Sequence, residues 1–164
     1  DNPLVVATPH VGEAAEILTQ FGEEWSRAEV EKDIEGAAVR LAHLARCVVV
    51  VKGATTCVAT PAGTSLCFQA PTAWGATAGA GDVLAGMICA AVAQVQALAL
   101  QEGSSLSIDD LAGPVACAVG LHGFAAASAA GILDTTLEPT GSQGHPIVAT
   151  DIIRAVPNAF EQIL

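Results

Sequence analysis

The chain has 164 residues, of which 52% are hydrophobic and only 14% are charged. Its formal net charge of −11, with only six Lys and Arg, excludes the basic patches that nucleic acids and anionic membranes require of a partner. This length allows one core, so we expect one domain at most. The apolar excess indicates a fragment, or a chain that buries much of its surface against something else.

The first predicted element is an apolar strand at residues 4–7, followed by a polar turn and a helix over residues 14–18. Short continuous apolar runs are typical of central parallel strands covered on both faces. His10 and Glu13 then follow the carboxyl end of this strand, where open α/β sheets bind ligands. We interpret His10 as a functional side chain, with a local hydrogen bond as the alternative, and Glu13 as an acid that complements the helix dipole.

A long amphipathic helix is predicted over residues 28–46, because apolar residues recur there at three- and four-residue steps. A buried strand at 47–51 completes a parallel βαβ unit with a right-handed crossover. Lys52 lies at the carboxyl end of this strand, in the same way that His10 follows the first strand. Because the chain has so few cations, we interpret Lys52 as a phosphate contact; a lysine extending into solvent is the alternative.

The second half of the chain is predicted to be a hairpin followed by helices. Strands at 56–60 and 65–69 form the hairpin, and Trp74 lies in the loop after it, as a buried anchor or stacked on an aromatic ligand. Helices are expected over residues 82–100, over 107–130 with a bend at Pro114, and from residue 150 to a break at Pro157, with an irregular loop at 133–144.

Two of these helices are apolar enough to raise the alternative of a membrane hairpin. Gln94, Gln96 and His122 lie inside them, and Lys, Arg, Trp and Tyr are missing from their ends, so we expect buried helices of a soluble protein. His122 is then a core histidine. The five cysteines form no Cys-x-x-Cys pair and have no zinc-type histidine spacing, which favours buried, reduced thiols and a cytoplasmic location.

The most informative segment is 76–86, where a Gly-x-Gly-Asp turn leads into an apolar helix. The first N–H groups of a helix have no partner within it, and the helix dipole adds partial positive charge, so the backbone of residues 78–81 is predicted to bind a phosphate. Asp82 would repel that phosphate as a ligand but could act as a base beside it. Helix capping by Asp82 is the alternative, with even weight when the motif is taken alone.

Three motifs occur in order: Thr8-Pro9-His10-x-Gly12-Glu13, Val-Val-Val-Lys52-Gly53-x-x-Thr56 and the turn at 76–86, with Leu121-His122-Gly123 after them. Together they resemble the ADP- or ATP-dependent NAD(P)H-hydrate dehydratase family. The resemblance implies a ribokinase-like α/β fold, a three-layer α/β/α arrangement with a mainly parallel sheet. It also implies repair of hydrated NADH and NADPH (NADHX and NADPHX), a lyase activity that uses ATP or ADP as phosphoryl donor.

The resemblance also assigns residues. It implies that His10 and Asp82 contact the hydrated nucleotide, with Asp82 catalytic. The residues that it implies for holding ATP or ADP are Lys52, Gly53, Ala54, Thr55, Thr56, Gly79, Ala80 and Gly81.

The sequence departs from the family pattern in three ways. Val11 replaces a frequent proline, and Ala80 stands where the family often has Ser or Thr; neither change removes a charge. The family's domain begins with further strands and helices that have no counterpart here, so residues 1–164 resemble its C-terminal portion, incomplete at the N-terminus. The resemblance further implies a homo-oligomer, and in some bacteria an epimerase domain fused ahead of the dehydratase.

The implied chemistry starts with Asp82 taking the proton of the ring hydroxyl as its oxygen attacks the terminal phosphorus of ATP or ADP. Backbone donors and Mg²⁺ would hold the charge, with the metal on phosphates and water because no carboxylate cluster of ligand spacing occurs. The phosphorylated hydrate would expel phosphate and then lose a carbon-bound proton. Two alternatives remain: a small-molecule or vitamin kinase of the same fold, which stops after phosphorylation, and a non-catalytic nucleotide-binding fragment.

Overall fold

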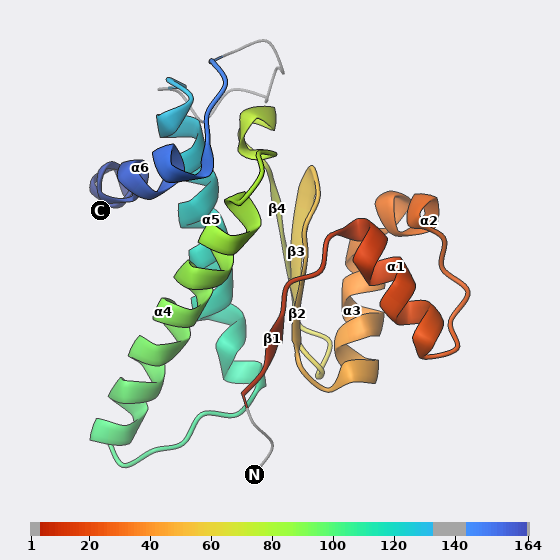
Figure 1. Cartoon of the computed structure of the whole chain (residues 1–164). Helices are drawn as coiled ribbons and strands as arrows, with labels where there is room; N and C mark the ends of the chain where they lie inside the picture. Colours follow the sequence, from red (N-terminus) through yellow and green to blue (C-terminus); the bar gives the residue numbers. More distant parts are fainter. Residues whose placement is uncertain (1–3, 133–143, 164) are drawn as a thin grey trace. The chain divides into compact units, whose positions relative to one another are not determined.

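The computed structural model describes residues 4–132 and 144–163 (Figure 1). The chain divides into two compact units, one of residues 1–69 and 92–116 and the other of residues 70–91 and 117–164. Each unit is described by itself below. The loop predicted at 133–144 lies outside the described residues, except for Gly144.

The first unit contains a four-stranded sheet in the order β1-β2-β3-β4. Its strands are β1 (Val6–Ala7), β2 (Val48–Val51), β3 (Thr55–Ala59) and β4 (Ser65–Gln69). β1 and β2 are parallel, with Val6 opposite Val48, which confirms the predicted βαβ unit. The other two strand pairs are antiparallel, as the predicted hairpin requires for β3 and β4. The α/β fold is thus as expected, but the described sheet is mixed, because short turns can join only antiparallel neighbours.

Three helices, α1 (Val11–Gln20), α2 (Arg27–Lys32) and α3 (Ile34–Ala45), cover one face of this sheet (Figure 1). The prediction of one continuous helix over residues 28–46 is wrong. Asp33 ends α2 and caps α3, because its Oδ1 accepts a hydrogen bond of 2.9 Å from the amide of Gly36. A side chain at residue 36 would overlap that carboxylate.

The core of the first unit lies between these helices and the sheet. Leu18 of α1 and Leu41 of α3 are buried in one cluster with Val49 and Val51 of β2. The intervening valines of β2 are also fully buried, so both faces of this strand are covered, as its continuous apolar sequence predicts.

The second unit contains η1 (Ala73–Gly75) and parts of α4 (Ala80–Gln101) and α5 (Ala112–Ala129), together with α6 (Ala149–Ile163). Its core joins Ala125 of α5 to Ile147 and to Ile152 of α6, and half-buried Trp74 packs against it. This contact confirms Trp74 as the anchor of the loop.

Two proline predictions need correction. α6 continues through Pro157 instead of breaking there. Pro114 lies in the first turn of α5, directly after the 3-10 turn η2 (Asp109–Leu111), so its missing N–H removes no helix hydrogen bond. The capping box predicted before α5 forms only in part. The amide and hydroxyl of Ser107 both donate to Asp110 Oδ2 at 2.7 Å, but the cap residue of η2 is Ile108, which makes no side-chain cap hydrogen bond.

The cysteine prediction is wrong for four of the five residues. Cys57 and Cys67 lie opposite each other across β3 and β4 and form a disulfide. Cys89 and Cys117 are exposed, and only Cys47 is a buried free thiol. Inferring a reducing compartment from buried thiols therefore loses its basis.

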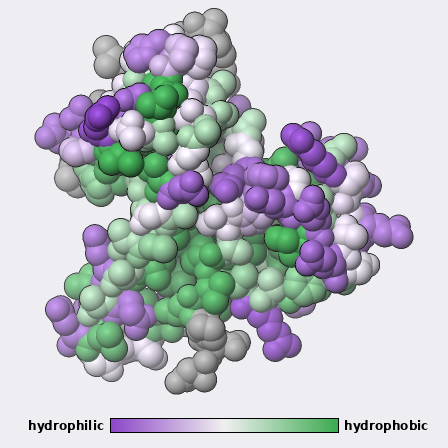
Figure 2. All heavy atoms as spheres, in the orientation of Figure 1, coloured by the Kyte–Doolittle hydropathy of each residue, from purple (hydrophilic) through white to green (hydrophobic). Residues whose placement is uncertain are grey.

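The apolar helices are less buried than predicted. Ala80–Gln101 and Asp109–Ala129 are long and apolar enough to cross a membrane by length and composition alone, but core helices of soluble proteins pass the same test. In the most apolar 18-residue stretch of each helix, 50% of Asp109–Ala129 is buried, against 17% of Ala80–Gln101. The prediction of a buried helix is thus wrong for α4 in this chain, where Leu100 is 67% exposed. Figure 2 accordingly shows hydrophobic surface beside polar surface on the face that it presents.

Candidate functional site

The predicted site residues fall into two groups, one in each compact unit. The first group follows the ends of β1 and β2. His10 and Lys52 form an isolated parallel bridge there, and the amide of Lys52 donates to the carbonyl of Pro9 at 2.8 Å. The two residues are therefore neighbours at the carboxyl edge of the parallel pair, as their positions after the two strands predict.

His10 also has a local structural role. Its Nδ1 accepts a hydrogen bond of 3.1 Å from the amide of Glu13, and Glu13 Oε2 accepts one of 2.7 Å from the amide of His10, so the two residues form a capping box at the start of α1. Because Nδ1 is the acceptor, the neutral ring carries its proton on Nε2, which lies 3.4 Å from Glu13 Oε1. The local hydrogen bond considered as the alternative for His10 thus exists. Its side chain is 58% exposed and accessible to a ligand, and the substrate contact stays a prediction.

The segment from Lys52 to Thr56 turns the chain from β2 into β3. Gly53 has no room for a side chain, because a Cβ there would lie 3.0 Å from the carbonyl oxygen of Thr55 and 3.2 Å from Ile34 Cδ1. The hydroxyl of Thr56 lies 3.5 Å from the amide and 3.4 Å from the carbonyl oxygen of Gly53, at the outer limit of hydrogen bonding. Ala54 is exposed at this turn. The nucleotide contacts of these residues stay predictions.

The second group is the glycine turn, which we define as residues 77–82. Gly79 has a φ of +85°, which side-chain-bearing residues rarely adopt, and α4 begins directly after it. The amide of Ala80 donates to the carbonyl of Thr77 at 3.1 Å, and the amide of Asp82 donates to the carbonyl of Gly79 at 3.1 Å. Within the described chain, the amides of Ala78, Gly79 and Gly81 have no acceptor. The anion-binding prediction therefore rests on these three donors, since the turn itself uses the amide of Ala80.

Asp82 is the third residue of α4 and is exposed. Its carboxylate makes no hydrogen bond or ion pair with any residue that the structure describes. The cap position before the helix belongs to Gly79, so the alternative interpretation of Asp82 as a helix cap is wrong. An accessible carboxylate next to the unpaired amide of Gly81 is an arrangement suited to a base beside a bound phosphoryl group.

His122 contacts this turn, which its interpretation as a core histidine did not predict. The ring is half-buried on α5, and Nε2 lies 3.0 Å from the carbonyl oxygen of Ala80. Burial lowers the pKa of His122, and the hydrogen bond to Ala80 opposes this shift in part. The signal in the sequence was the Leu121-His122-Gly123 motif, but its position gives no indication of which backbone group the ring meets.

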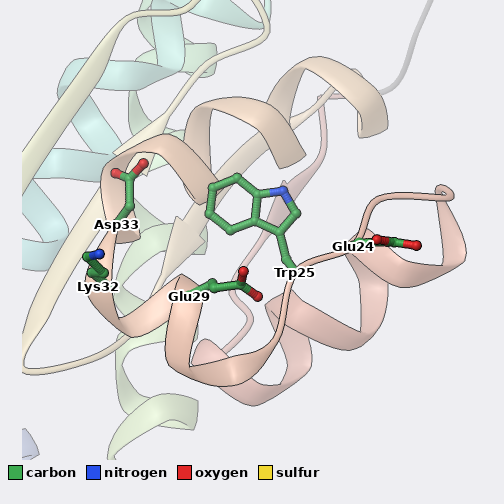
Figure 3. Close-up of a pocket in the computed structure, with 5 residues that line it drawn as sticks. All are labelled: Glu24, Trp25, Glu29, Lys32 and Asp33. Carbon is green, nitrogen blue, oxygen red and sulfur yellow. The ribbon is translucent and has the colours of Figure 1, made fainter.

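A cavity of about 370 Å³ lies elsewhere in the first unit, beside Trp25 (Figure 3). Its other lining residues are Glu24, Glu29, Lys32 and Asp33. Two of the carboxylates are already used as helix caps: Glu29 with Ser26 at the start of α2, and Asp33 with Gly36 at the start of α3. The cavity contains none of the predicted site residues, and we assign it no ligand.

No metal cluster forms within residues 4–132 and 144–163, where three or more His, Cys, Asp or Glu side chains nowhere come together.

A sequence model described as NAD(P)H-hydrate dehydratase matches residues 2–140. The Bifunctional NAD(P)H-hydrate repair enzyme Nnr of Mycobacterium tuberculosis H37Rv is 39% identical over 92 residues, which are 56% of this chain and 18% of that protein. The enzyme of the same name from Thermofilum pendens is 40% identical over 85 residues, 52% of this chain and 15% of the relative.

Two solved structures resemble the whole chain. An ADP/ATP-dependent NAD(P)H-hydrate dehydratase from Bacillus subtilis, co-crystallised with ATP and Mg²⁺, has a TM-score of 0.69 and 25% identity, over 98% of this chain and 48% of that one. Bacillus subtilis YxkO, a member of the UPF0031 family, has a TM-score of 0.66 and 26% identity, over 99% of this chain and 51% of that one. The chain therefore spans about half the length of these structures and less than a fifth of the curated relatives.

Proposed function

Because the chain belongs to the NAD(P)H-hydrate dehydratase family, we propose that the protein dehydrates hydrated NADH and NADPH back to the active coenzymes, with ATP or ADP as phosphoryl donor. This activity is a hydro-lyase reaction of metabolite repair. The observation that carries the proposal is the glycine turn, where the exposed carboxylate of Asp82 directly follows the unpaired amide of Gly81. The names of the relatives and the nucleotide in the B. subtilis crystals support the same activity.

Asp82 is the proposed general base. It takes the proton of the substrate's ring hydroxyl while the hydroxyl oxygen attacks the terminal phosphorus of the nucleotide. The phosphoanhydride bond to that phosphorus breaks, and ADP (from ATP) or AMP (from ADP) leaves with its electron pair. The amides of Gly79 and Gly81 donate to the transferred phosphoryl group and stabilise its charge. The phosphate formed on the ring is a better leaving group than hydroxide, so it departs with the electron pair of its carbon–oxygen bond, pushed by the ring nitrogen. Loss of a carbon-bound proton then restores the dihydropyridine.

The remaining residues are proposed to bind. His10 contacts the hydrated nicotinamide nucleotide, while Lys52 and the turn from Gly53 to Thr56 hold ATP or ADP together with Gly79 and Gly81. Lys52 supplies a positive charge to a chain that has few. Mg²⁺ bound to the nucleotide phosphates supplies further charge neutralisation.

The assembly and location of the protein are also proposed from the family. The relatives are named bifunctional, which supports a second catalytic domain, such as an epimerase, in the same polypeptide. The exposed apolar residues of α4 support burial against protein, including other copies in a homo-oligomer. The family is one of soluble repair enzymes, which supports a proposed cytoplasmic location, whereas the Cys57–Cys67 disulfide does not support it.

The test is an assay of the full-length protein with hydrated NADH, comparing ATP with ADP and following the absorbance of the reduced nicotinamide. Turnover is expected with at least one nucleotide. Asp82→Asn should abolish turnover and leave nucleotide affinity nearly unchanged, whereas Glu102→Gln, which removes one exposed carboxylate just past the other end of α4, should leave both unchanged. A stable phosphorylated product would instead favour a small-molecule kinase, and near-normal turnover of Asp82→Asn would refute the base assignment.

A further inference from the structure

The hydrogen bond between His122 and Ala80 brings α5 to the start of α4 across 42 positions of sequence. A carbonyl oxygen is only an acceptor, so Nε2 of His122 must be the donor and carry the proton. Around the ring, α5 is composed mostly of alanine and other apolar residues. A polar side chain at this position therefore has a specific partner in the glycine turn rather than a general role in packing.

The carbonyl of Ala80 and the amide of Gly81 belong to the same peptide group. A trans peptide is planar, so its C=O and N–H bonds point in opposite directions. Ala80 is the first residue of α4, so the helix already directs its carbonyl along the axis. A side chain that also holds this carbonyl helps to fix the direction of the amide of Gly81, away from His122. This amide is one of the unpaired donors of the turn within the described residues.

Close packing brings the ring within reach of the turn. A Cβ on Gly123, the residue after His122, would lie 3.2 Å from Pro71 Cδ, and one on Gly75 would lie 3.3 Å from the Cβ of Ala126 on α5. A Cβ on Gly79 would lie 3.2 Å from the Cβ of Ala149 in α6. α5 and α6 thus contact the loop and the turn at positions where a larger residue would force them apart.

We propose that His122 is a positioning residue of the phosphate-binding turn, which holds the Ala80–Gly81 peptide so that the amide of Gly81 is presented to the transferred phosphoryl group. This inference rests on the proposed function. His122 itself touches neither substrate nor nucleotide. It acts on the step in which charge develops on the phosphoryl group, where the orientation of a donor matters most.

The test compares two amide variants that differ in reach. The side-chain nitrogen of Gln in His122→Gln occupies about the place of the histidine Nε2, whereas that of Asn in His122→Asn falls short by about one bond, roughly 1.5 Å. Both are measured in the full-length protein for kcat and KM with hydrated NADH, for ATP affinity by calorimetry, and for thermal unfolding. Leu121→Met, a volume-conserving change at the neighbouring position, is the control.

His122→Gln is expected to keep kcat within about threefold of the unmodified protein, and His122→Asn to lose about 10- to 100-fold in kcat with a smaller change in KM, as for other outer residues that orient a site. Equal loss in both variants together with equal loss of thermal stability, or no loss in either, would overturn the proposal. If the unmodified protein binds ATP but does not dehydrate hydrated NADH, the proposed function is refuted while the positioning role of His122 is not. In that case, weaker ATP binding by His122→Asn than by His122→Gln would still support positioning by His122.

Discussion

Gly79→Ala tests the geometry of the glycine turn with the smallest possible change. The φ of +85° at this residue disfavours any side chain by about 1–2 kcal/mol, as in the left-handed region generally. The added Cβ would also lie 3.2 Å from the Cβ of Ala149, so α6 would have to shift by a few tenths of an ångström. We expect the free energy of unfolding to fall by about 2 kcal/mol in total.

Gly86→Ala is the matched control, because it adds the same methyl group to α4. Gly86 lies within the helix with no positive φ, and a Cβ there would meet no other atom within 4 Å. Alanine at such a position should stabilise the helix by about 0.5–1 kcal/mol. The two variants are thus expected to change stability in opposite directions.

The assay is urea denaturation of both variants and the unmodified protein, with ATP affinity measured in parallel. Gly79→Ala should also weaken ATP binding, since it displaces one of the unpaired amides of the turn, whereas Gly86→Ala should not. A Gly79→Ala protein at least as stable as Gly86→Ala would refute the left-handed conformation at the turn and the anion site built on it.

Three further predictions concern charge, protonation and the disulfide. Lys52→Ala should weaken ATP affinity by about tenfold, measured by calorimetry, whereas Lys32→Ala should not; equal effects would indicate only a general loss of positive charge. Burial lowers the pKa of His122 below 6.5, so just below that pH the unfolded chain binds more protons than the folded chain. The free energy of unfolding should therefore decrease as the pH is lowered through this range. The difference in unfolding free energy between the unmodified protein and His122→Gln should therefore depend on pH between about 7 and 5, and a constant difference would contradict the shift. Reduction of the Cys57–Cys67 disulfide, which links residues 10 positions apart, should cost about 2–3 kcal/mol of stability by denaturation with and without dithiothreitol. A variant with both cysteines changed to serine should lose as much and respond no further to the reductant, whereas Cys117→Ser should behave like the unmodified protein.

Patterns of a few neighbouring residues predicted much of the local structure. The apolar run of β2 and the segment before His10 predicted a parallel pair of strands, and His10 and Lys52 lie together at its end. The hairpin of β3 and β4 followed from the turn residues between two strand-like segments. These predictions succeed because strand formation and turn geometry depend mainly on residues close in sequence.

The errors have identifiable physical causes. Asp33 interrupts the helix predicted over 28–46, because its carboxylate caps a new helix more favourably than it continues the old one. Pro157 does not break α6, where tertiary packing of Ile152 and Ala159 on the core outweighs one lost backbone bond. The burial of α4 was overestimated because composition alone does not reveal which face of a helix has a partner.

The sequence by itself determined that a glycine turn precedes Asp82, that His10 and Lys52 end neighbouring strands, and to which family these motifs belong. Only the tertiary structure decided that Cys57 is bonded to Cys67, that the amide of Ala80 is used within the turn, and that His122 binds the Ala80 carbonyl. Motifs are read from neighbouring residues, whereas the disulfide depends on the register of β3 and β4, and the His122 contact depends on how α5 packs on α4. The helices α4 and α5 must approach closely before a ring on one can orient a peptide group on the other.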